Sequence, residues 1–243
     1  MIFFLSFHRM TLEPVATFHS PLSSKFGIPR QSGLVPALEG EIRLEGRFRR
    51  EEALRGLEGF SHLWLLWGFS ANRETASDSL LVRPPRLGGN RSVGVFASRS
   101  PYRPNPIGLS SVRIEAIDAA AGIIRVSGAD LMDGTPVYDI KPYVKYTDSH
   151  PDARSGFVDE TLWQPLEVVI PAALESRFSP QDLAALRQLL AQDPRPAYQD
   201  SDKAYGFPFA GYDVRFTVAG SVLTVLDCVP AVGCDGCERE RDQ

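Results

Sequence analysis

Short runs of β-branched and aromatic residues, separated by turn-forming residues, recur through the first 150 positions of this chain. Runs of this length and spacing are typical of antiparallel strands joined by tight connections. We expect strands at about Val15–His19, Glu41–Leu44, His62–Phe69, Val93–Ser98, Leu109–Ile117, Ile123–Ser127 and Val137–Val144. One helix is predicted here, at Glu51–Leu57, because acidic residues occupy its first turn. Many short strands with few helices imply an antiparallel sheet that curls or closes.

A second pattern begins near residue 160. Leu166–Ile170 predicts a strand, and a helix should follow, with Ser179 as its N-cap and Pro180 at its first position. A hairpin is expected from Asp213–Val218 and Val222–Cys228. We therefore predict a mainly β protein with an antiparallel single-sheet β-barrel domain at 11–150, a small C-terminal α+β domain at 160–230, and tails at 1–10 and 231–243.

Charge is distributed unevenly along the chain. The formal net charge is -4, which by itself disfavours a nucleic-acid partner. Residues 13–148 nevertheless hold 17 Lys and Arg against 15 Asp and Glu, whereas residues 151–243 hold 8 against 15. Between Asp78 and Glu115 no acid occurs, and the basic residues there are Arg83, Arg86, Arg91, Arg99, Arg103 and Arg113. This run is either a solvated face with structural ion pairs or a field for anions such as phosphate.

The three cysteines lie near the C-terminus, at Cys228, Cys234 and Cys237, so no disulfide framework supports the fold and a cytoplasmic protein is the default expectation. Cys234 and Cys237 lack a second ligand pair, so we expect a mobile tail and no metal site; a metal or redox centre is the alternative. The apolar start, Met1–Phe7, is too short for a signal peptide or a membrane span, and Met10 is a plausible start of translation.

Three segments are rich in glycine, proline and arginine. They are Phe26–Gly33, Arg83–Asn90 and Arg99–Gly108. Such a density of proline excludes a central strand, so we expect rigid loops that direct Arg and Asn side chains at a ligand. Neither a G-x-G-x-x-G fingerprint nor a P-loop occurs, and loops of the β domain must therefore hold any nucleotide-like cofactor.

Residues 129–143 alternate acids with apolar residues and bring Asp133, Asp139 and Lys141 close together in the sequence. On a strand Asp139 and Lys141 share a face, which suits either a structural ion pair or proton handling.

In the second domain Arg195, Tyr198, Tyr205, Phe207 and Phe209 are expected on loops. Aromatic side chains beside arginine could stack on bases, and packing against the first domain is the equal alternative.

Several of these segments, in the same order, resemble the signature runs of the TsaA-like (TrmO-type) family of tRNA methyltransferases. The segments are Phe26–Gln31, Gly59–Trp64, Arg83–Asn90, Ser98–Gly108, Asp133–Tyr143 and, for the C-terminal domain of that family, Asp193–Tyr198. The resemblance covers about residues 12–229. Ser70–Asn72 and the C-terminal cysteines depart from the family pattern.

The resemblance implies a homodimeric β-barrel enzyme that methylates N6 of N6-threonylcarbamoyladenosine beside the anticodon of threonine tRNA, with S-adenosylmethionine as donor. The implied cofactor contacts are Gln31, Ser32, Gly33, Leu34, Ser70, Ala71, Arg99, Leu109, Gly128, Ala129, Asp130 and Leu131. We expect tRNA contacts from Arg30, Arg86, Arg91, Arg103, Asn105, Arg195 and Tyr198.

The acceptor nitrogen must lose a proton, and Asp133 or Asp139 is the expected base, with Lys141 or Arg195 stabilising negative charge. The alternatives are the same fold and cofactor with another RNA or small-molecule acceptor, or a noncatalytic RNA-binding barrel.

Overall fold

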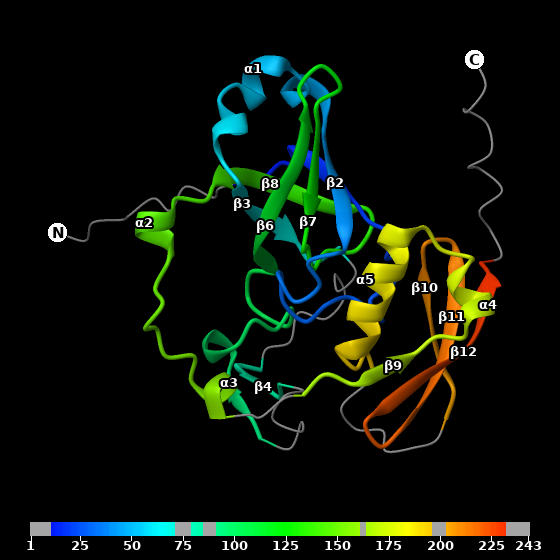
Figure 1. Cartoon of the computed structure of the whole chain (residues 1–243). Helices are drawn as coiled ribbons and strands as arrows, with labels where there is room; N and C mark the ends of the chain where they lie inside the picture. The colour runs from blue at the N-terminus through cyan, green and yellow to red at the C-terminus, as the bar shows by residue number, and fades with distance from the viewer. Residues whose placement is uncertain (1–10, 71–78, 85–90, 161–163, 196–202, 232–243) are drawn as a thin grey trace, which may run out of the picture.

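A computed structural model of the chain describes residues 11–70, 79–84, 91–160, 164–195 and 203–231. Its first part is a closed antiparallel barrel with the strand order β1-β2-β7-β6-β3-β8 (Figure 1). The strands are β1 (Ala16–His19), β2 (Glu39–Leu44), β3 (His62–Gly68), β6 (Ile107–Asp118), β7 (Ile123–Ser127) and β8 (Thr135–Pro142). The predicted barrel is confirmed.

Alternation along the strands fills the inside of the barrel. Leu63 and Leu65 on β3, Val112 on β6 and Ile124 on β7 are buried, whereas Arg125, between two buried residues of β7, faces solvent. This period of two is the pattern that a sheet with one apolar face requires.

Short helical turns connect β2 to β3 at one end of the barrel (Figure 1). They are η1 (Gly46–Phe48), α1 (Glu51–Leu54) and η2 (Leu57–Gly59). The predicted helix Glu51–Leu57 is shorter than expected because the chain turns at Gly56, where φ is 87°.

The predicted strand Val93–Ser98 is wrong for most of its length. Only β5 (Val93–Gly94) pairs, with β4 (Leu81–Val82), and the 3-10 turn η5 (Val95–Ala97) follows. The hydroxyl of Ser98 donates to the carbonyl of Val95 at 3.0 Å and closes this turn. Within the described ranges the segment has no longer partner strand, so its β-forming residues do not extend the pairing.

The C-terminal part combines a four-stranded sheet, in the order β10-β11-β12-β9, with one long helix. Its elements are β9 (Glu167–Val169), α4 (Ala172–Glu175), α5 (Pro180–Ala191), β10 (Tyr205–Phe209), β11 (Tyr212–Ala219) and β12 (Val222–Pro230), and α2 (Lys145–Asp148) and α3 (Phe157–Glu160) precede them. As predicted, Ser179 caps α5: its hydroxyl accepts the amide proton of Asp182 at 3.0 Å. The small α+β domain is therefore confirmed as a fold.

The expected loop aromatics lie instead on β10. Phe207 and Phe209 are fully buried, and Tyr205 is half-buried and stacks on Phe216. Pro208 is tolerated because β10 is an edge strand. A base-stacking platform made of Tyr205, Phe207 and Phe209 is therefore wrong, and packing in the core explains these residues.

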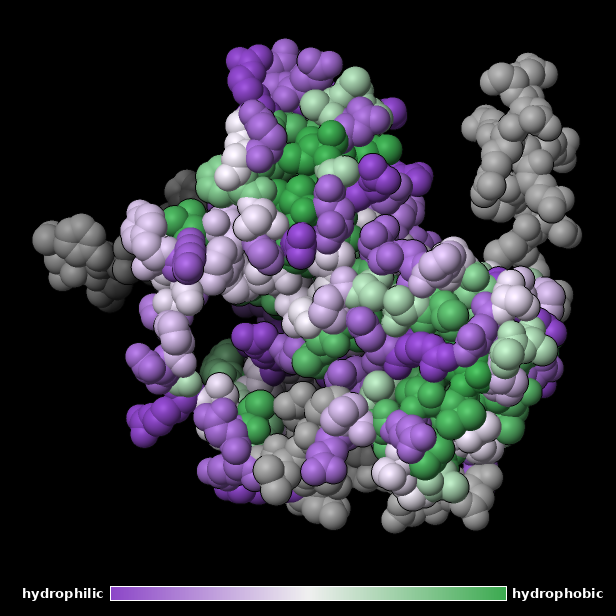
Figure 2. Space-filling model, viewed as in Figure 1, coloured by the Kyte–Doolittle hydropathy of each residue, from purple (hydrophilic) through white to green (hydrophobic). Residues whose placement is uncertain are grey.

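One hydrophobic core joins the two parts of the chain. Leu22, Val35 and Leu38, from the connection between β1 and β2, pack in the same cluster as Leu186 of α5 and Phe207 of β10. Figure 2 shows hydrophobic residues gathered over the C-terminal sheet, whereas the end of the barrel around α1 is hydrophilic. The connection at 20–38 is thus held between barrel and C-terminal sheet.

No helix among the described residues is long and apolar enough to cross a bilayer.

Gly40 of β2 tests the packing of the barrel. A Cβ there would lie 2.4 Å from Cζ of the buried Phe18 ring and 2.8 Å from the carbonyl oxygen of His19. We expect Gly40→Ala to lower the free energy of unfolding by about 1–3 kcal/mol, measured by urea denaturation.

Gly59→Ala is the matched control, since no atom lies within 4 Å of a Cβ at that position. It should change stability by no more than about 0.5 kcal/mol. Equal stability of the two variants would contradict the packing described for Gly40.

Candidate functional site

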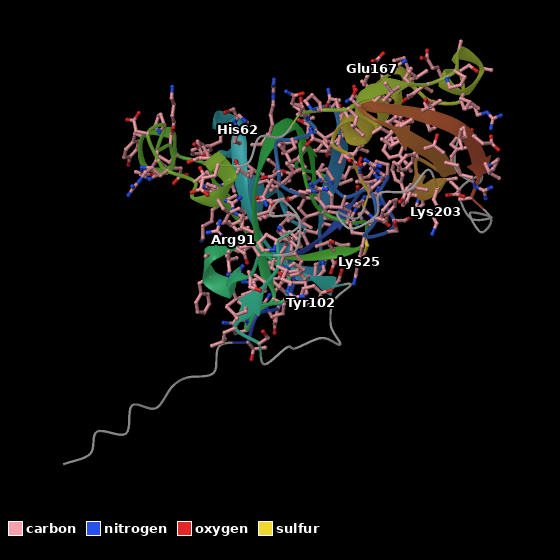
Figure 3. All side chains as sticks on the ribbon, turned by 90° about the horizontal axis from the view of Figure 1, so that it is seen from below. Lys25, His62, Arg91, Tyr102, Glu167 and Lys203 are labelled. Carbon is pink, nitrogen blue, oxygen red and sulfur yellow. The ribbon has the colours of Figure 1, made fainter. Side chains whose placement is uncertain are left out.

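A cavity of about 780 Å³ opens where β3 ends and β6 begins. The side chains and loops around it are Lys25, Ile28, Pro29, Arg30, Gln31, Trp67, Phe69, Ser70, Phe96, Ser98, Arg99, Pro101, Tyr102, Arg103, Pro104, Asn105, Ile107, Gly108, Leu109, Asp130, Met132 and Thr135. Figure 3 shows Lys25 and Tyr102 on the same side of the molecule, away from His62 and Glu167. The proline-rich loop after Arg99 is irregular, as predicted, and forms one wall.

A buried polar chain reaches this cavity from inside the barrel. The indole N–H of Trp67 donates to the hydroxyl of Ser110 at 2.9 Å, and this hydroxyl donates to the Asp130 carboxylate at 2.5 Å. Burial raises the pKa of Asp130 above its ordinary value, although the Ser110 hydroxyl, the backbone amide of Ser32 and the charge of Arg99 oppose the rise. A carboxylate with fixed donors therefore lies in the wall of the cavity.

Two backbone segments lie together beside Asp130. The amide of Gly33 donates to the carbonyl of Gly128 at 2.8 Å, and the amide of Gly128 donates to the carbonyl of Leu38 at 2.9 Å. In the same region, the guanidinium of Arg99 donates to the side-chain oxygen of Gln31 at 2.5 Å. The fold thus brings the segments at 31–34, 99 and 128–131 to one place.

A smaller cavity, of about 150 Å³, lies between the 25–30 segment and the end of α5. Lys25, Ile28, Pro29 and Arg30 line both cavities, so the two adjoin. Arg30 donates to the backbone carbonyl of Asp193 at 3.2 Å.

Asp193 and Arg195 form a bidentate ion pair in the wall of the smaller cavity, with bonds of 2.8 and 2.9 Å. Partial burial raises the pKa of Asp193, but the hydrogen bonds and charge of Arg195 outweigh it, so this pKa lies below its ordinary value. Asp193 also has a left-handed backbone, with φ of 50°.

Comparison with known proteins places this geometry in a family. The profile described as the tRNA-methyltransferase O N-terminal domain matches residues 17–149, and that of the TrmO C-terminal domain matches residues 164–231. The chain belongs to the TrmO family. The predicted resemblance is therefore confirmed.

Relatives of known name cover nearly all of the chain. The tRNA (adenine(37)-N6)-methyltransferase of Escherichia coli K12 is 40% identical in an alignment of 230 residues that covers 90% of this chain and 97% of that protein. A putative S-adenosylmethionine-dependent methyltransferase, RcsF, of Pseudomonas aeruginosa is 45% identical in an alignment of 217 residues that covers 85% of this chain and 91% of the relative.

A crystal structure of TrmO from Pseudomonas aeruginosa superposes with a TM-score of 0.76 at 36% sequence identity, and the match covers 93% of this chain and all of that one.

The residues that the TrmO resemblance assigned to the cofactor lie near one another. Gln31, Ser70, Arg99, Leu109 and Asp130 line the larger cavity. The others are neighbours in the chain: Ser32, whose amide faces Asp130, and Gly33, Leu34, Gly128, Ala129 and Leu131. Ala71 lies outside the described residues.

The expected tRNA contacts are divided. Arg30, Arg103 and Asn105 line the larger cavity, and Arg195 lines the smaller one. Arg91 is exposed and does not line either cavity (Figure 3). Arg86 and Tyr198 lie outside the described residues, as do Met10, Cys234 and Cys237.

The carboxylates expected to act as base do not line the larger cavity. Asp133 accepts the backbone amide of Ser20 at 3.1 Å and lies 3.2 Å from the imidazole of His19. Asp139 and Lys141 form a half-exposed ion pair of 2.7 Å on the outside of β8. Their catalytic role stays a prediction.

Sequence reasoning missed Lys25 and several aromatic or apolar lining residues, among them Trp67, Phe96 and Tyr102. Trp67 continues the alternating buried positions of Leu63 and Leu65 on β3, and this pattern is the same as that of ordinary core residues. Lys25 directly precedes the glycine- and proline-rich segment Phe26–Gly33, but a single lysine in a sequence does not indicate a binding site.

In the part of the chain that the structure describes, no group of three or more His, Cys, Asp and Glu residues is placed to hold a metal ion.

The ion pair between Asp193 and Arg195 should support stability in a pH-dependent way. We expect Asp193→Asn, which tolerates the left-handed backbone, to lower the free energy of unfolding by about 1–2 kcal/mol at pH 7. The folded-state pKa lies below the unfolded value, so the contribution is present above about pH 4 and is lost as pH falls through the folded-state pKa.

Denaturation of both proteins at a series of pH values measures this difference. It should shrink on acidification, and a gap that stayed constant from pH 7 to the acid limit would refute the assignment.

Proposed function

We propose that this chain transfers the methyl group of S-adenosylmethionine to N6 of N6-threonylcarbamoyladenosine at position 37 of threonine tRNA. The enzyme class, an S-adenosylmethionine-dependent tRNA methyltransferase, follows from family membership and from relatives named as such. Position 37 and the N6 atom come from the name of the Escherichia coli relative. The threonylcarbamoyl group and the choice of threonine tRNA are the finer part of the proposal.

The larger cavity fits this donor. Trp67, Phe69 and Leu109 offer apolar surface for an adenine ring, Arg99 offers a partner for a carboxylate, and Asp130 a partner for a cation. The segments at 31–34 and 128–131 are hydrogen-bonded to each other beside this cavity. When bound, the donor supplies a methyl group on a sulfonium, and the transfer leaves a neutral thioether and a displaced N6 proton.

The position of Lys25 and Arg30, which line both cavities, supports the threonylcarbamoyl group as part of the substrate. A threonylcarbamoyl substituent ends in a carboxylate, which a lysine and an arginine at this junction would pair with. The smaller cavity has room for about five water molecules at roughly 30 Å³ each, and so accepts a small polar group.

Positioning supplies much of the acceleration in a reaction of this kind. The acceptor nitrogen has to lie in line with the methyl group at about 3–3.5 Å. Pro29 and the loop at 101–106, with its three prolines, form a rigid frame for this alignment. The base stays proposed as Asp133 or Asp139. Asp139 on β8 and Leu109 on β6 both pair with Leu66 of β3, so they lie on the same outer face of the sheet. Asp139 is thus two strands, or roughly 10 Å, from Leu109 in the cavity wall.

The tRNA would approach over the open side of the larger cavity. Arg103 and Asn105 lie there, and Arg30 and Arg195 continue this polar surface toward the C-terminal domain. Arginine suits phosphate because its planar fork forms paired hydrogen bonds. Arg86, Arg91 and Tyr198 remain proposed contacts. A tRNA substrate implies a cytoplasmic location.

We also propose a homodimer. Large apolar side chains around the cavity are exposed, with 81% of Phe96, 55% of Leu109 and 46% of Tyr102 accessible. An exposed apolar surface of this kind is typical of a protein interface. Sedimentation equilibrium should give about twice the 26.8 kDa chain mass, and a monomer at micromolar concentration would contradict the dimer.

Nucleoside mass spectrometry tests the proposal. Threonine tRNA with and without the threonylcarbamoyl group is incubated with the protein and S-adenosylmethionine, and then digested. We expect a gain of one methyl group only on the threonylcarbamoylated nucleoside. A methyl gain on unmodified adenosine would contradict the finer proposal, and no gain on either tRNA despite donor binding would point to another acceptor.

Lys25→Met tests the proposed recognition of the carboxylate. We expect the variant to lose at least about tenfold in kcat/KM for the modified tRNA, since a charged hydrogen bond contributes about 1.5–3 kcal/mol. Lys203→Met is the matched control, because Lys203 lies on the C-terminal domain and lines neither cavity (Figure 3). Equal activity of both variants would remove Lys25 from the substrate site.

A further inference from the structure

The charges around the larger cavity are strongly unequal. Among the described residues that line it, four are basic, namely Lys25, Arg30, Arg99 and Arg103. The one carboxylate in that lining is Asp130. Four cations attract the carboxylate of a ligand and its phosphates, but they repel a ligand that carries positive charge. A positively charged group is favoured only where it lies close to Asp130.

Asp130 is held in one place by its neighbours. Its Oδ1 accepts the hydroxyl proton of Ser110, which is buried and in turn accepts the indole N–H of Trp67. The backbone amide of Ser32 also lies near the Asp130 carboxylate and lowers its pKa. These groups come from β6, β3 and the 31–34 segment, so the position of the carboxylate is fixed by the barrel. Neither Ser110 nor Trp67 carries a charge that could neutralise it.

A half-buried carboxylate in this setting is shielded from part of the water that would ordinarily stabilise it. Desolvation raises the pKa of Asp130, and Arg99 is the charged group that counteracts it. Arg99, however, also donates to Gln31 at 2.5 Å. The charge of Arg99 affects Asp130 less than the loss of water does, so the charge of this carboxylate is compensated only in part until a cationic ligand binds.

We infer that the Asp130 carboxylate makes this site prefer the sulfonium of S-adenosylmethionine over the neutral thioether of S-adenosylhomocysteine. The two ligands share their adenosine, ammonium and carboxylate groups, and differ by one methyl group and one positive charge. Asp130 is thus the group that distinguishes donor from product. The inference rests on the cofactor assigned in the proposed function and names the residue that recognises the positive charge of that cofactor.

This preference has a consequence for turnover. Methyl transfer removes the positive charge, so the attraction to Asp130 ends in the same step. The product keeps the carboxylate that the surrounding cations attract, but it lacks the positive charge that Asp130 attracts. Donor binding and product release are in this way coupled to one carboxylate.

Isothermal titration calorimetry of the full chain with each ligand tests the inference, and it needs neither tRNA nor turnover. Asp130→Asn keeps the shape of the side chain and the acceptor for Ser110 but removes the charge. We expect it to weaken S-adenosylmethionine by at least about tenfold more than S-adenosylhomocysteine, as for the loss of one charge from a partly desolvated pair. Glu167→Gln, which removes a charge on β9 outside the cavity lining, should leave both affinities unchanged (Figure 3).

An equal loss for both ligands would overturn the inference, because Asp130 would then hold a group that they share, such as the ammonium. If Asp130→Asn fails to fold, calorimetry of the wild-type chain still tests the inference. An analogue with an ammonium in place of the methylsulfonium should bind more tightly than S-adenosylhomocysteine, and the reverse order would overturn the inference. A wild-type chain that bound none of these ligands would contradict the proposed function itself.

Discussion

The fixed course of the chain from Leu22 to Leu38 is the constraint on which the site depends. Leu22, Val35 and Leu38 are buried in a core whose other half comes from α5 and the C-terminal sheet. Gly27 lies so close to Phe207 that a Cβ there would come within 2.5 Å of the ring. The barrel and the C-terminal domain therefore clamp this segment from two sides. The position of Arg30 and Gln31 in the cavity wall follows from apolar packing, although neither side chain takes part in it.

The polar chain inside the barrel depends on the same closure. Ser110 and Trp67 face inward on neighbouring strands, and their hydrogen bond directs the Ser110 hydroxyl to Asp130. A carboxylate that is partly shielded from water is costly unless donors surround it. The donors here come from strands that the closed sheet holds in register. The fold thus tolerates a charge in the cavity wall and gives it a defined position.

Much of the fold could be predicted because a half-buried sheet imposes a period of two on its sequence. Six predicted strands match the six strands of the barrel, and the Ser179-Pro180 signal marked α5. The errors arise where local pattern and tertiary pairing disagree. Val93–Ser98 is rich in β-forming residues but has only a two-residue partner strand, whereas Tyr205–Phe209 contains Gly and Pro and still pairs as an edge strand.

The site was less accessible to prediction. The loops of the cavity stood out through their prolines and arginines, but closeness in sequence does not reveal which side of a strand a carboxylate faces. Asp133 and Asp139 were therefore predicted as bases, while the carboxylate in the cavity wall is Asp130, which only the family resemblance had assigned, as a cofactor contact. Lys25 gave no signal at all. Its place at the junction of two cavities depends on a domain contact between residues more than 150 positions apart.

The central claim is that the two adjoining cavities form one reaction centre. A crystal structure would test it most directly, with the chain bound to S-adenosylhomocysteine and to an anticodon stem-loop that carries N6-threonylcarbamoyladenosine. The account predicts the thioether beside Asp130 in the larger cavity and the threonyl carboxylate at Lys25 and Arg30, where the smaller cavity begins. A cofactor bound elsewhere, or a modified base that left both cavities empty, would contradict it.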